Sequence, residues 1–284
     1  MTGNLPLVSS EWLAAQLGRP DFAVADASWY LPGAQRDALG EFKARHIPGA
    51  VLFDIDAISD RASELPHMLP GPVEFSAAMQ HLGIGDSDFV VFYDGVGIYS
   101  SPRALWMMRA MGHDRAAVLD GGLPKWLREK RPVQSGSAAP AERSQFTARY
   151  RAGMVRDLAA MQRNLRTHDE QVVDARSPGR FRGEEPEPRA GVRPGHIPGS
   201  SNVHYAGVMN SDGTLRSGPE LRQLFAEQGV ALDRPMVTSC GSGITAAIVA
   251  LALEAAGAKQ IALYDGSWSE WGARPEAPVA VGAA

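Results

Sequence analysis

The chain has 284 residues, 44% of them apolar and 21% charged, which is typical of a soluble globular protein with one large or two medium domains. Its formal net charge of −4 gives no basic footprint for nucleic acid and no polybasic patch for an anionic membrane, so we expect neither as a partner. The single cysteine excludes an intramolecular disulfide and fits a reducing compartment, and we expect a cytoplasmic location.

The first half of the chain alternates short apolar runs with helical patterns. The N-terminus lacks a basic start followed by an apolar run, so no signal peptide is expected. The patterns predict strands at 22–25, 89–93 and 117–119, and helices at 11–17, 74–82, 102–111 and 125–130. Short apolar strands that alternate with helices predict an α/β fold, a parallel sheet flanked by helices.

The second half shows the same alternation. Strands are predicted at 171–173, 236–239 and 261–263, and helices at 155–165, 220–228 and 244–256. The last helix is the most apolar stretch of the chain, but it is too short to span a bilayer.

Three short motifs recur in the same order with near-constant offsets: Asp-Ala at Asp26 and Asp174, His-Ile-Pro-Gly at His46 and His196, and Asp-Gly at Asp120 and Asp265. This spacing indicates duplication of a whole domain rather than a short repeat. We therefore predict a first domain at 8–130 and a second at 152–280. Residues 131–151, rich in Pro, Ser, Ala and charge, are predicted to be a linker that runs over the surface.

The only cysteine, Cys240, follows a predicted strand and begins the loop Cys-Gly-Ser-Gly-Ile-Thr. Gly241 and Gly243 let the backbone wrap round the sulfur, and the helix that begins near Ile244 adds partial positive charge. Backbone N–H groups from Gly241 to Thr245 would then favour thiolate over thiol. A lone cysteine is more often a buried small hydrophobe, but a core cysteine needs neither the glycines nor the helix start. We predict a nucleophile.

The first half provides an internal comparison. Asp94 follows strand 89–93, where Cys240 follows strand 236–239. A carboxylate cannot accept sulfur, so the first domain should be catalytically silent. A cysteine phosphatase would need an arginine six residues after the cysteine, and that residue is Ala246. The scattered histidines show no metal-ligand spacing, so we expect no metal.

With these motifs, residues 8–275 resemble the rhodanese family. The cysteine loop is similar to that of the 3-mercaptopyruvate sulfurtransferases, whose usual form has valine where this chain has Ile244. Thiosulfate-using members usually carry basic residues in the two positions occupied here by Gly241 and Ser242. The resemblance implies two tandem rhodanese-like domains, the second catalytic, and a persulfide on Cys240.

Four arginines stand in residues 176–189, just after a predicted strand. Arginine forks match carboxylates, and an α-keto acid offers a carboxylate beside a carbonyl. The resemblance points to Arg180 and Arg189 as substrate-binding residues. The alternative is that the arginines pair with nearby glutamates on the surface, and we favour that alternative for Arg182.

Three further residues enter through the resemblance. In the mercaptopyruvate enzymes, the residues matching Asp56 and His67 are proposed to assist a loop serine, here Ser242. A carboxylate would orient the histidine, which would polarise the hydroxyl. Asp56 and His67 are separated along the chain, so the sequence alone does not bring them together.

The resulting prediction is a transfer of sulfur from 3-mercaptopyruvate, through Cys240, to cyanide, a thiol or a dithiol protein, with release of pyruvate. No cofactor is required. Two alternatives remain open: a thiosulfate sulfurtransferase, and a persulfide carrier module without turnover of a small donor.

Overall fold

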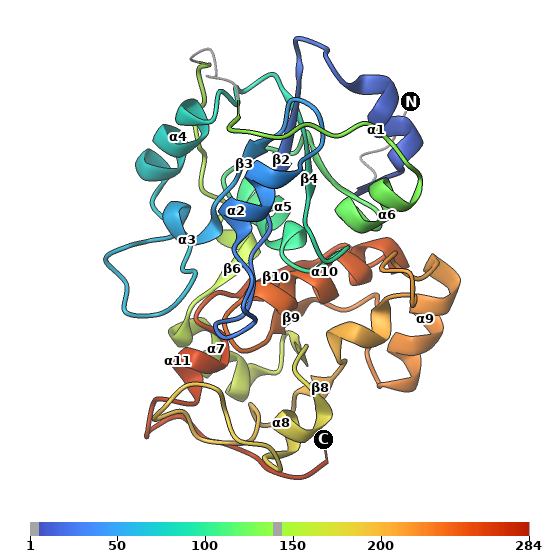
Figure 1. The fold of residues 1–284 in the computed structure, drawn as a ribbon. Helices are drawn as coiled ribbons and strands as arrows, with labels where there is room; N and C mark the ends of the chain where they lie inside the picture. The colour runs from blue at the N-terminus through green and yellow to red at the C-terminus, as the bar shows by residue number, and fades with distance from the viewer. Residues whose placement is uncertain (1–5, 139–143, 284) are drawn as a thin grey trace. The chain divides into compact units, whose positions relative to one another are not determined.

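The computed structural model describes residues 6–138 and 144–283 of the chain. They form two compact units, coloured mainly blue to green and yellow to red in Figure 1. The first unit takes in the described residues up to Arg61, then Leu69–Arg151 and Ser211–Leu215. The second unit takes in Ala62–Met68, Ala152–Asn210 and the described residues from Arg216 onward. Each unit therefore includes one short segment from the opposite half of the sequence.

Five parallel strands form the sheet of the first unit, in the order β1-β5-β4-β2-β3. The strands are β1 (Leu7–Val8), β2 (Phe22–Asp26), β3 (Val51–Leu52), β4 (Phe89–Tyr93) and β5 (Ala116–Leu119). Strands β2 and β4 pair along their whole length, from Phe22 with Phe89 to Asp26 with Tyr93. This register brings the end of β2 beside the end of β4, where the loop of Asp94 begins.

Helices connect these parallel strands, as crossover connections require. They are α1 (Ser10–Gln16), α2 (Ala38–Ala44), α3 (Ile55–Ile58), α4 (Pro72–His81), α5 (Ser101–Ala110) and α6 (Gly122–Arg128). The first helix, predicted at 11–17, begins one residue earlier, at Ser10, because the Ser9 side chain accepts a hydrogen bond from the Trp12 N–H and caps α1.

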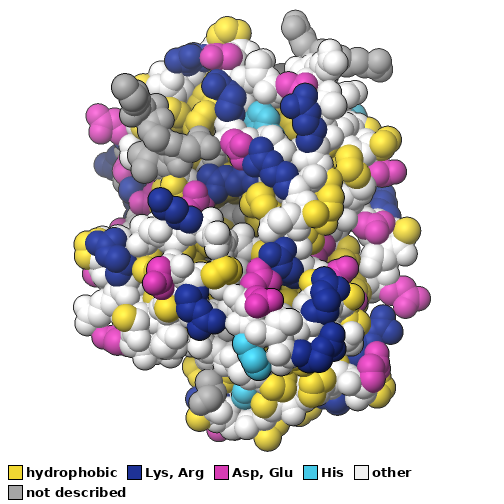
Figure 2. Space-filling view, turned by 180° about the vertical axis from the view of Figure 1, so that it is seen from behind, with side chains coloured by type: hydrophobic (Ala, Val, Ile, Leu, Met, Phe, Trp, Pro, Cys, Tyr) yellow, Lys and Arg dark blue, Asp and Glu magenta, His cyan; other side chains and the backbone are white. Residues whose placement is uncertain are grey.

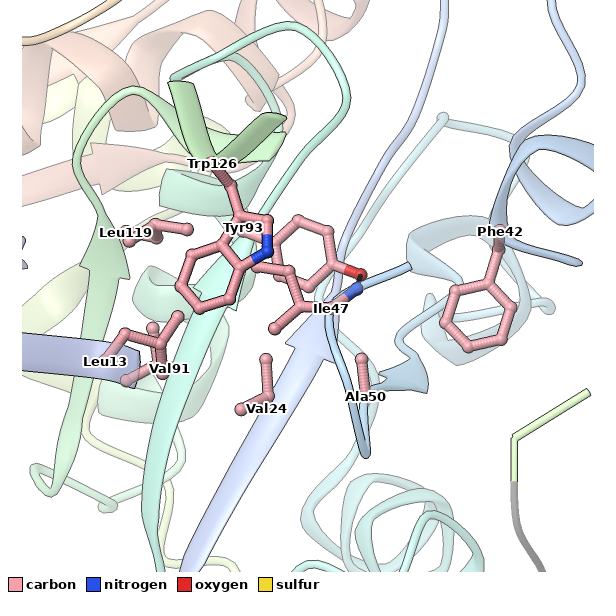
Figure 3. Packing of buried hydrophobic residues seen from close by; sticks show 9 residues of the cluster. All are labelled: Leu13, Val24, Phe42, Ile47, Ala50, Val91, Tyr93, Leu119 and Trp126. Carbon is pink, nitrogen blue, oxygen red and sulfur yellow. Dashed lines mark hydrogen bonds between the residues drawn. The ribbon is translucent and has the colours of Figure 1, made fainter. Parts of the chain in front are cut away.

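The core of the first unit lies where helices meet the sheet (Figure 3). Leu13 of α1, Phe42 of α2 and Trp126 of α6 pack with Val24 and Val91 of the two paired central strands. Side chains of a strand alternate between its two faces, and all of β4 beyond its first residue is buried. Both faces of this sheet are therefore covered, as is usual for parallel sheets.

The second unit repeats this topology with the strand order β6-β10-β9-β7-β8, again all parallel. Its strands are β6 (Val155–Arg156), β7 (Gln171–Asp174), β8 (Ser201–Asn202), β9 (Met236–Ser239) and β10 (Ile261–Tyr264). The matching order confirms the predicted α/β class, with two tandem domains that each hold a parallel sheet flanked by helices.

Helices of the second unit are η1 (Ala152–Met154), α7 (Leu158–Thr167), α8 (Pro178–Arg182), η2 (Tyr205–Val208), α9 (Gly218–Glu227), α10 (Ile244–Ala256) and α11 (Ser267–Trp271). Met161 of α7 and Trp271 of α11 pack in one buried cluster with Val237 and Tyr264 of the central strands. The predicted helix at 244–256 is confirmed with the same bounds.

Two predicted helices were wrong at their starts by three residues. The helix expected at 125–130 begins at Gly122. We expected a helix at 155–165, but Val155 and Arg156 form the edge strand β6 and pair with β10. The helix begins only at Leu158, after Asp157, whose side chain accepts a hydrogen bond from the Ala160 N–H at 2.7 Å. An N-cap aspartate holds its own backbone in an extended conformation, which separates strand from helix.

The described part of the predicted linker packs onto the first unit. Phe146 is only 2% exposed, and its ring lies against Phe75 of α4. The Arg149 N–H donates to the Met111 carbonyl at 2.7 Å. This segment is therefore held by the first unit along part of its length, while the domain boundaries given above stay a prediction.

The recurring histidines are buried in both units. His46 Nδ1 lies 2.8 Å from the Phe42 carbonyl oxygen, and His196 Nδ1 lies 2.8 Å from the Phe181 carbonyl oxygen. Each ring stacks on the phenylalanine whose carbonyl it contacts. The same contacts in both units indicate a structural role for the histidine of the His-Ile-Pro-Gly motif.

Charge is distributed over the surface without strong segregation on the face seen in Figure 2, where Lys and Arg side chains are interspersed with Asp and Glu. Within residues 6–138 and 144–283, no helix is both long and apolar enough to cross a bilayer.

Candidate active site

Cys240 lies at the carboxyl end of β9, the central strand of the second sheet, and is 2% exposed. Parallel sheets bind ligands at this end of their strands. The Gly243 N–H points back at the sulfur, with 3.1 Å between N and Sγ. Gly243 has a φ of 83°, which glycine adopts without steric cost, and α10 begins at the next residue, Ile244. Of the N–H groups predicted to face the sulfur, the structure thus shows that of Gly243, next to the start of a helix.

The beginning of α11 holds this loop from behind. The Trp268 N–H donates to the Cys240 carbonyl at 2.9 Å, and the Ser269 N–H donates to the Gly241 carbonyl at 2.9 Å. The Cys240 N–H donates to the Ser267 hydroxyl at 3.3 Å. These bonds fix the backbone on both sides of Cys240. Sequence reasoning missed them, because they join segments far apart along the chain.

Arg180, on α8, lies against the cysteine loop. A Cβ atom added to Gly241 would stand 3.1 Å from Arg180 Nη2, so glycine leaves the room in which this guanidinium lies. Arg180 also donates to Glu187 from Nε at 3.2 Å and from Nη2 at 2.5 Å. Arg180 therefore lies beside the cysteine loop and pairs with a glutamate whose side chain is buried rather than on the surface. Its role in substrate binding stays a prediction.

Arg189 is half-buried in the same region. Burial lowers the pKa of its guanidinium, the nearby Cys240 sulfur raises that pKa, and the Arg180 guanidinium lowers it. Arg189 thus lies within electrostatic range of both residues. Two guanidinium groups thus lie near the sulfur, and such groups can bind a small anion.

Arg176 and Arg182 have other surroundings. Arg176 is fully buried, where it donates to Asp174 and Glu187 and lies over the Trp268 ring at 4.3 Å. Because Glu187 bonds both Arg176 and Arg180, a buried ion-pair network orients Arg180. Arg182 pairs with Glu184 at 2.7 Å, and both side chains are exposed, as expected from the sequence.

The three residues of the predicted proton relay have different surroundings. Ser242 is 8% exposed, and it follows Cys240 by two positions. His67 is 7% exposed, has a φ of 60°, and belongs to the second unit together with Cys240. Asp56 belongs to the first unit and accepts a hydrogen bond from Trp29 Nε1 at 2.9 Å. The roles of these three residues stay predictions.

In the first unit, the loop after β4 binds its own side chain. Asp94 is fully buried, and its carboxylate accepts six hydrogen bonds of 2.7–3.1 Å. The donors are the N–H groups of Val96, Gly97, Tyr99, Ser100 and Ser101 and the Ser101 hydroxyl. The loop is therefore an anion-binding nest, and an aspartate carboxylate fills it.

The first unit also repeats the arginine of the second. Arg36 Nη2 lies near Gly95, donates to the Gly95 carbonyl at 3.4 Å, and pairs with Glu41. A recess of about 500 Å³ beside it is lined by Arg36, Glu41, Arg45, Gly95 and Leu123, among others. An arginine–glutamate pair over the glycine after the loop's first residue is thus common to both units.

Comparisons with known proteins identify relatives of this chain. A model described as "Rhodanese-like domain" matches residues 9–129 and again 156–274. The human 3-mercaptopyruvate sulfurtransferase is 46% identical over 97% of this chain and 95% of its own. An Arabidopsis thaliana relative, "Thiosulfate/3-mercaptopyruvate sulfurtransferase 1, mitochondrial", is 40% identical over 96% of this chain and 78% of its own.

A solved structure of a similar protein shows the same fold. The crystal structure of SseA from Escherichia coli, described as having the rhodanese fold of 3-mercaptopyruvate sulfotransferases, superposes with a TM-score of 0.85. The match covers 93% of this chain and 98% of that one, at 37% sequence identity.

Proposed function

Since the chain belongs to the rhodanese family over both of its halves, we propose that it is a sulfurtransferase that takes sulfur from 3-mercaptopyruvate and carries it on Cys240 as a persulfide. The observation that carries this proposal is the Cys240 loop, in which a backbone N–H meets the sulfur while two arginines lie beside it. Gly241 has no side chain and Ser242 an uncharged one, so the cations that bind an anionic donor come from outside the loop.

The arginines hold the donor. Arg189 and Arg180 bind the carboxylate and the adjacent carbonyl of 3-mercaptopyruvate, because planar guanidinium forks match such paired oxygens. Glu187 restrains the guanidinium of Arg180 before substrate arrives. A pre-oriented arginine loses less conformational entropy when the donor binds.

Sulfur transfer then follows as a nucleophilic displacement. The Cys240 thiolate attacks the thiol sulfur of 3-mercaptopyruvate, an S–S bond forms, and the C–S bond of the donor breaks. Its electron pair leaves with the carbon as the enolate of pyruvate, which takes up a proton. The Gly243 N–H and its neighbours in the loop stabilise negative charge on the sulfur, as an oxyanion hole does for oxygen.

Ser242 transfers the proton that moves during the reaction. Its hydroxyl follows the nucleophile by two residues and is the nearest side-chain donor along the loop. We assign it the transfer of the proton between the donor thiol and the enolate. His67, oriented by Asp56, would assist it by polarising the hydroxyl.

A thiophilic acceptor completes the cycle. Cyanide, a small thiol or a reduced dithiol protein attacks the terminal sulfur of the persulfide and regenerates the Cys240 thiolate. The two half-reactions give ping-pong kinetics, and the chemistry requires no cofactor. We propose a reducing compartment such as the cytoplasm, where such acceptors are kept reduced.

Thiosulfate is the second candidate donor, and one relative carries both substrates in its name. The uncharged loop disfavours it, because a doubly charged oxoanion gains most from cations inside the loop. The third candidate, a persulfide carrier without turnover, does not account for the two arginines at the sulfur.

A single-turnover experiment tests the persulfide directly. The protein is mixed with 3-mercaptopyruvate without acceptor, and the peptide that contains Cys240 should gain one sulfur atom while one pyruvate per chain is released. Cys240 is the only cysteine, so no other thiol of the chain can carry the label. Pyruvate release without added sulfur on Cys240 would overturn the proposal.

A further inference from the structure

The carbonyl of Gly241 is held by two donors from one residue. The Ser269 hydroxyl donates to this oxygen at 2.5 Å, and the Ser269 N–H donates to it at 2.9 Å. Ser269 lies on α11, 28 residues further along the chain, and is 7% exposed. Two hydrogen bonds in a buried place fix the direction of one peptide group far better than one.

This peptide group joins Gly241 to Ser242. In a trans peptide the C=O and N–H bonds point in opposite directions. A Gly241 carbonyl directed at α11 therefore directs the Ser242 N–H away from α11, toward the interior of the loop.

The first unit shows what the interior of the loop contains. The first four positions of the two loops, 94–97 and 240–243, correspond, because Gly97 N–H meets Asp94 Oδ1 at 3.0 Å and Gly243 N–H meets Cys240 Sγ at 3.1 Å. Val96 corresponds to Ser242, and its N–H donates to Asp94 Oδ1 at 2.9 Å. In the first unit the N–H at this position thus faces the side chain that begins the loop.

The two units differ at the position of Ser269, whose N–H and hydroxyl donate to the Gly241 carbonyl. The Trp268 N–H donates to the Cys240 carbonyl, as the Leu123 N–H donates to the Asp94 carbonyl. The next residue is Ser269 in the second unit and Pro124 in the first. Proline has neither an N–H nor a hydroxyl.

The loop that begins at Asp94 therefore lacks this pair of donors for its Gly95 carbonyl. Its Gly95 carbonyl accepts only the 3.4 Å contact from Arg36 among the hydrogen bonds of the described residues. Its own carboxylate ligand, bonded six times, organises that loop from within. A cysteine sulfur has a single acceptor atom, so its loop needs an external constraint.

We propose that Ser269 is a positioning residue, which holds the Gly241–Ser242 peptide so that the Ser242 N–H faces the Cys240 sulfur and stabilises the negative charge of the sulfur during transfer. This inference rests on the proposed persulfide chemistry. The constraint acts on the reacting state, so its loss lowers kcat more than it raises KM.

The test compares Ser269→Ala and Ser269→Thr with Ser200→Ala. Ser200 is a matched control, because its buried hydroxyl also donates to a backbone carbonyl, that of Ile197, at 2.7 Å. With 3-mercaptopyruvate as donor and cyanide as acceptor, Ser269→Ala should lower kcat by about tenfold and change KM by less than about twofold. Ser269→Thr restores the hydroxyl and should keep kcat within about threefold of wild type.

Thermal unfolding of the three variants separates folding from positioning. Ser269→Ala and Ser200→Ala should lose similar stability, while only the former loses kcat. A wild-type kcat in Ser269→Ala, an equal loss in Ser200→Ala, or a threonine variant as slow as the alanine variant would overturn the inference. If wild type itself forms no persulfide on Cys240, the proposed function fails instead.

Discussion

Asp94 and Cys240 stand at the same position of the two repeated sheets, and the Gly97 N–H that donates to the Asp94 carboxylate corresponds to the Gly243 N–H that donates to the Cys240 sulfur. The duplicated loop thus has a different role in each unit. In the first unit the nest binds a fixed carboxylate and stabilises the fold. In the second unit it lies at Cys240, the proposed nucleophile, whose charge would change during the reaction.

The first prediction concerns the filled nest. In Asp94→Asn, an amide NH₂ group replaces one acceptor oxygen and meets backbone donors, so some buried N–H groups lose their partners. The free energy of unfolding of the first unit should fall by about 2–4 kcal/mol, measured from its transition in a urea titration. Asp233→Asn, a change at an exposed aspartate, is the control and should stay within about 0.5 kcal/mol. Equal stability of the two variants would show that the six bonds contribute little.

The second prediction concerns pH. Burial raises the pKa of Asp26 from 3.8 to about 6, while its Ser28 hydrogen bonds lower it. Since the folded pKa lies above the unfolded one, the stability from this group is complete below about pH 4 and is lost as pH rises to about 6. Asp26→Asn should therefore gain up to about 3 kcal/mol relative to wild type between pH 4 and pH 7, in urea titrations at both pH values. A difference that does not change with pH would contradict this account.

The equivalent aspartate of the second unit should behave differently. Asp174 is paired at 2.6 Å with the buried Arg176. Asp174→Asn should destabilise the second unit by about 3 kcal/mol at pH 7, because it leaves a buried guanidinium with one carboxylate fewer. The same urea titration measures both variants, and stabilisation by Asp174→Asn would refute the assignment.

The third prediction distinguishes the role of Arg189 from that of Arg182. Arg189→Ala should lower kcat/KM for 3-mercaptopyruvate by about 100-fold, because a charged hydrogen bond to the donor carboxylate is lost. Arg182→Ala removes an exposed pair on the same segment and should change kcat/KM by less than about twofold. Similar losses in both variants would mean that general positive charge, not a specific contact, attracts the donor.

The fourth prediction tests the proton relay. If His67 polarises Ser242, His67→Ala should lower kcat by about 100-fold, and the double variant with Ser242→Ala should be no slower than the single ones. Asp56→Asn should reproduce part of the loss. His81→Ala, a change at an exposed histidine, serves as the control. Fully additive losses in the double variant would show that the two residues act independently.

The long elements could be predicted from the sequence, because strands such as 89–93 and 236–239 are apolar along most of their length and buried on both faces. The two-residue edge strands β3 and β8 could not, since pairing with β2 and β7 defines them rather than any local pattern. Helix α8 was also missed, because five residues carry too little periodicity.

The site likewise contains residues that the sequence predicted and one that it did not. Cys240 and its glycines are contiguous, so sequence reasoning found the loop. Ser269 acts on Gly241 across 28 residues, and only the folded structure brings them together. The comparison of Ser269 with Pro124 was available in the duplicated sequence, but its meaning depends on which carbonyl each residue faces.

The central claim is tested most directly by steady-state turnover of wild type and Cys240→Ser with 3-mercaptopyruvate and with thiosulfate, using cyanide as acceptor. We predict that wild type prefers 3-mercaptopyruvate by at least about tenfold in kcat/KM, which corresponds to about 1.4 kcal/mol of transition-state discrimination, and that the variant is inactive with both donors. Preference for thiosulfate would contradict the donor assignment, and activity in Cys240→Ser would contradict the persulfide mechanism itself.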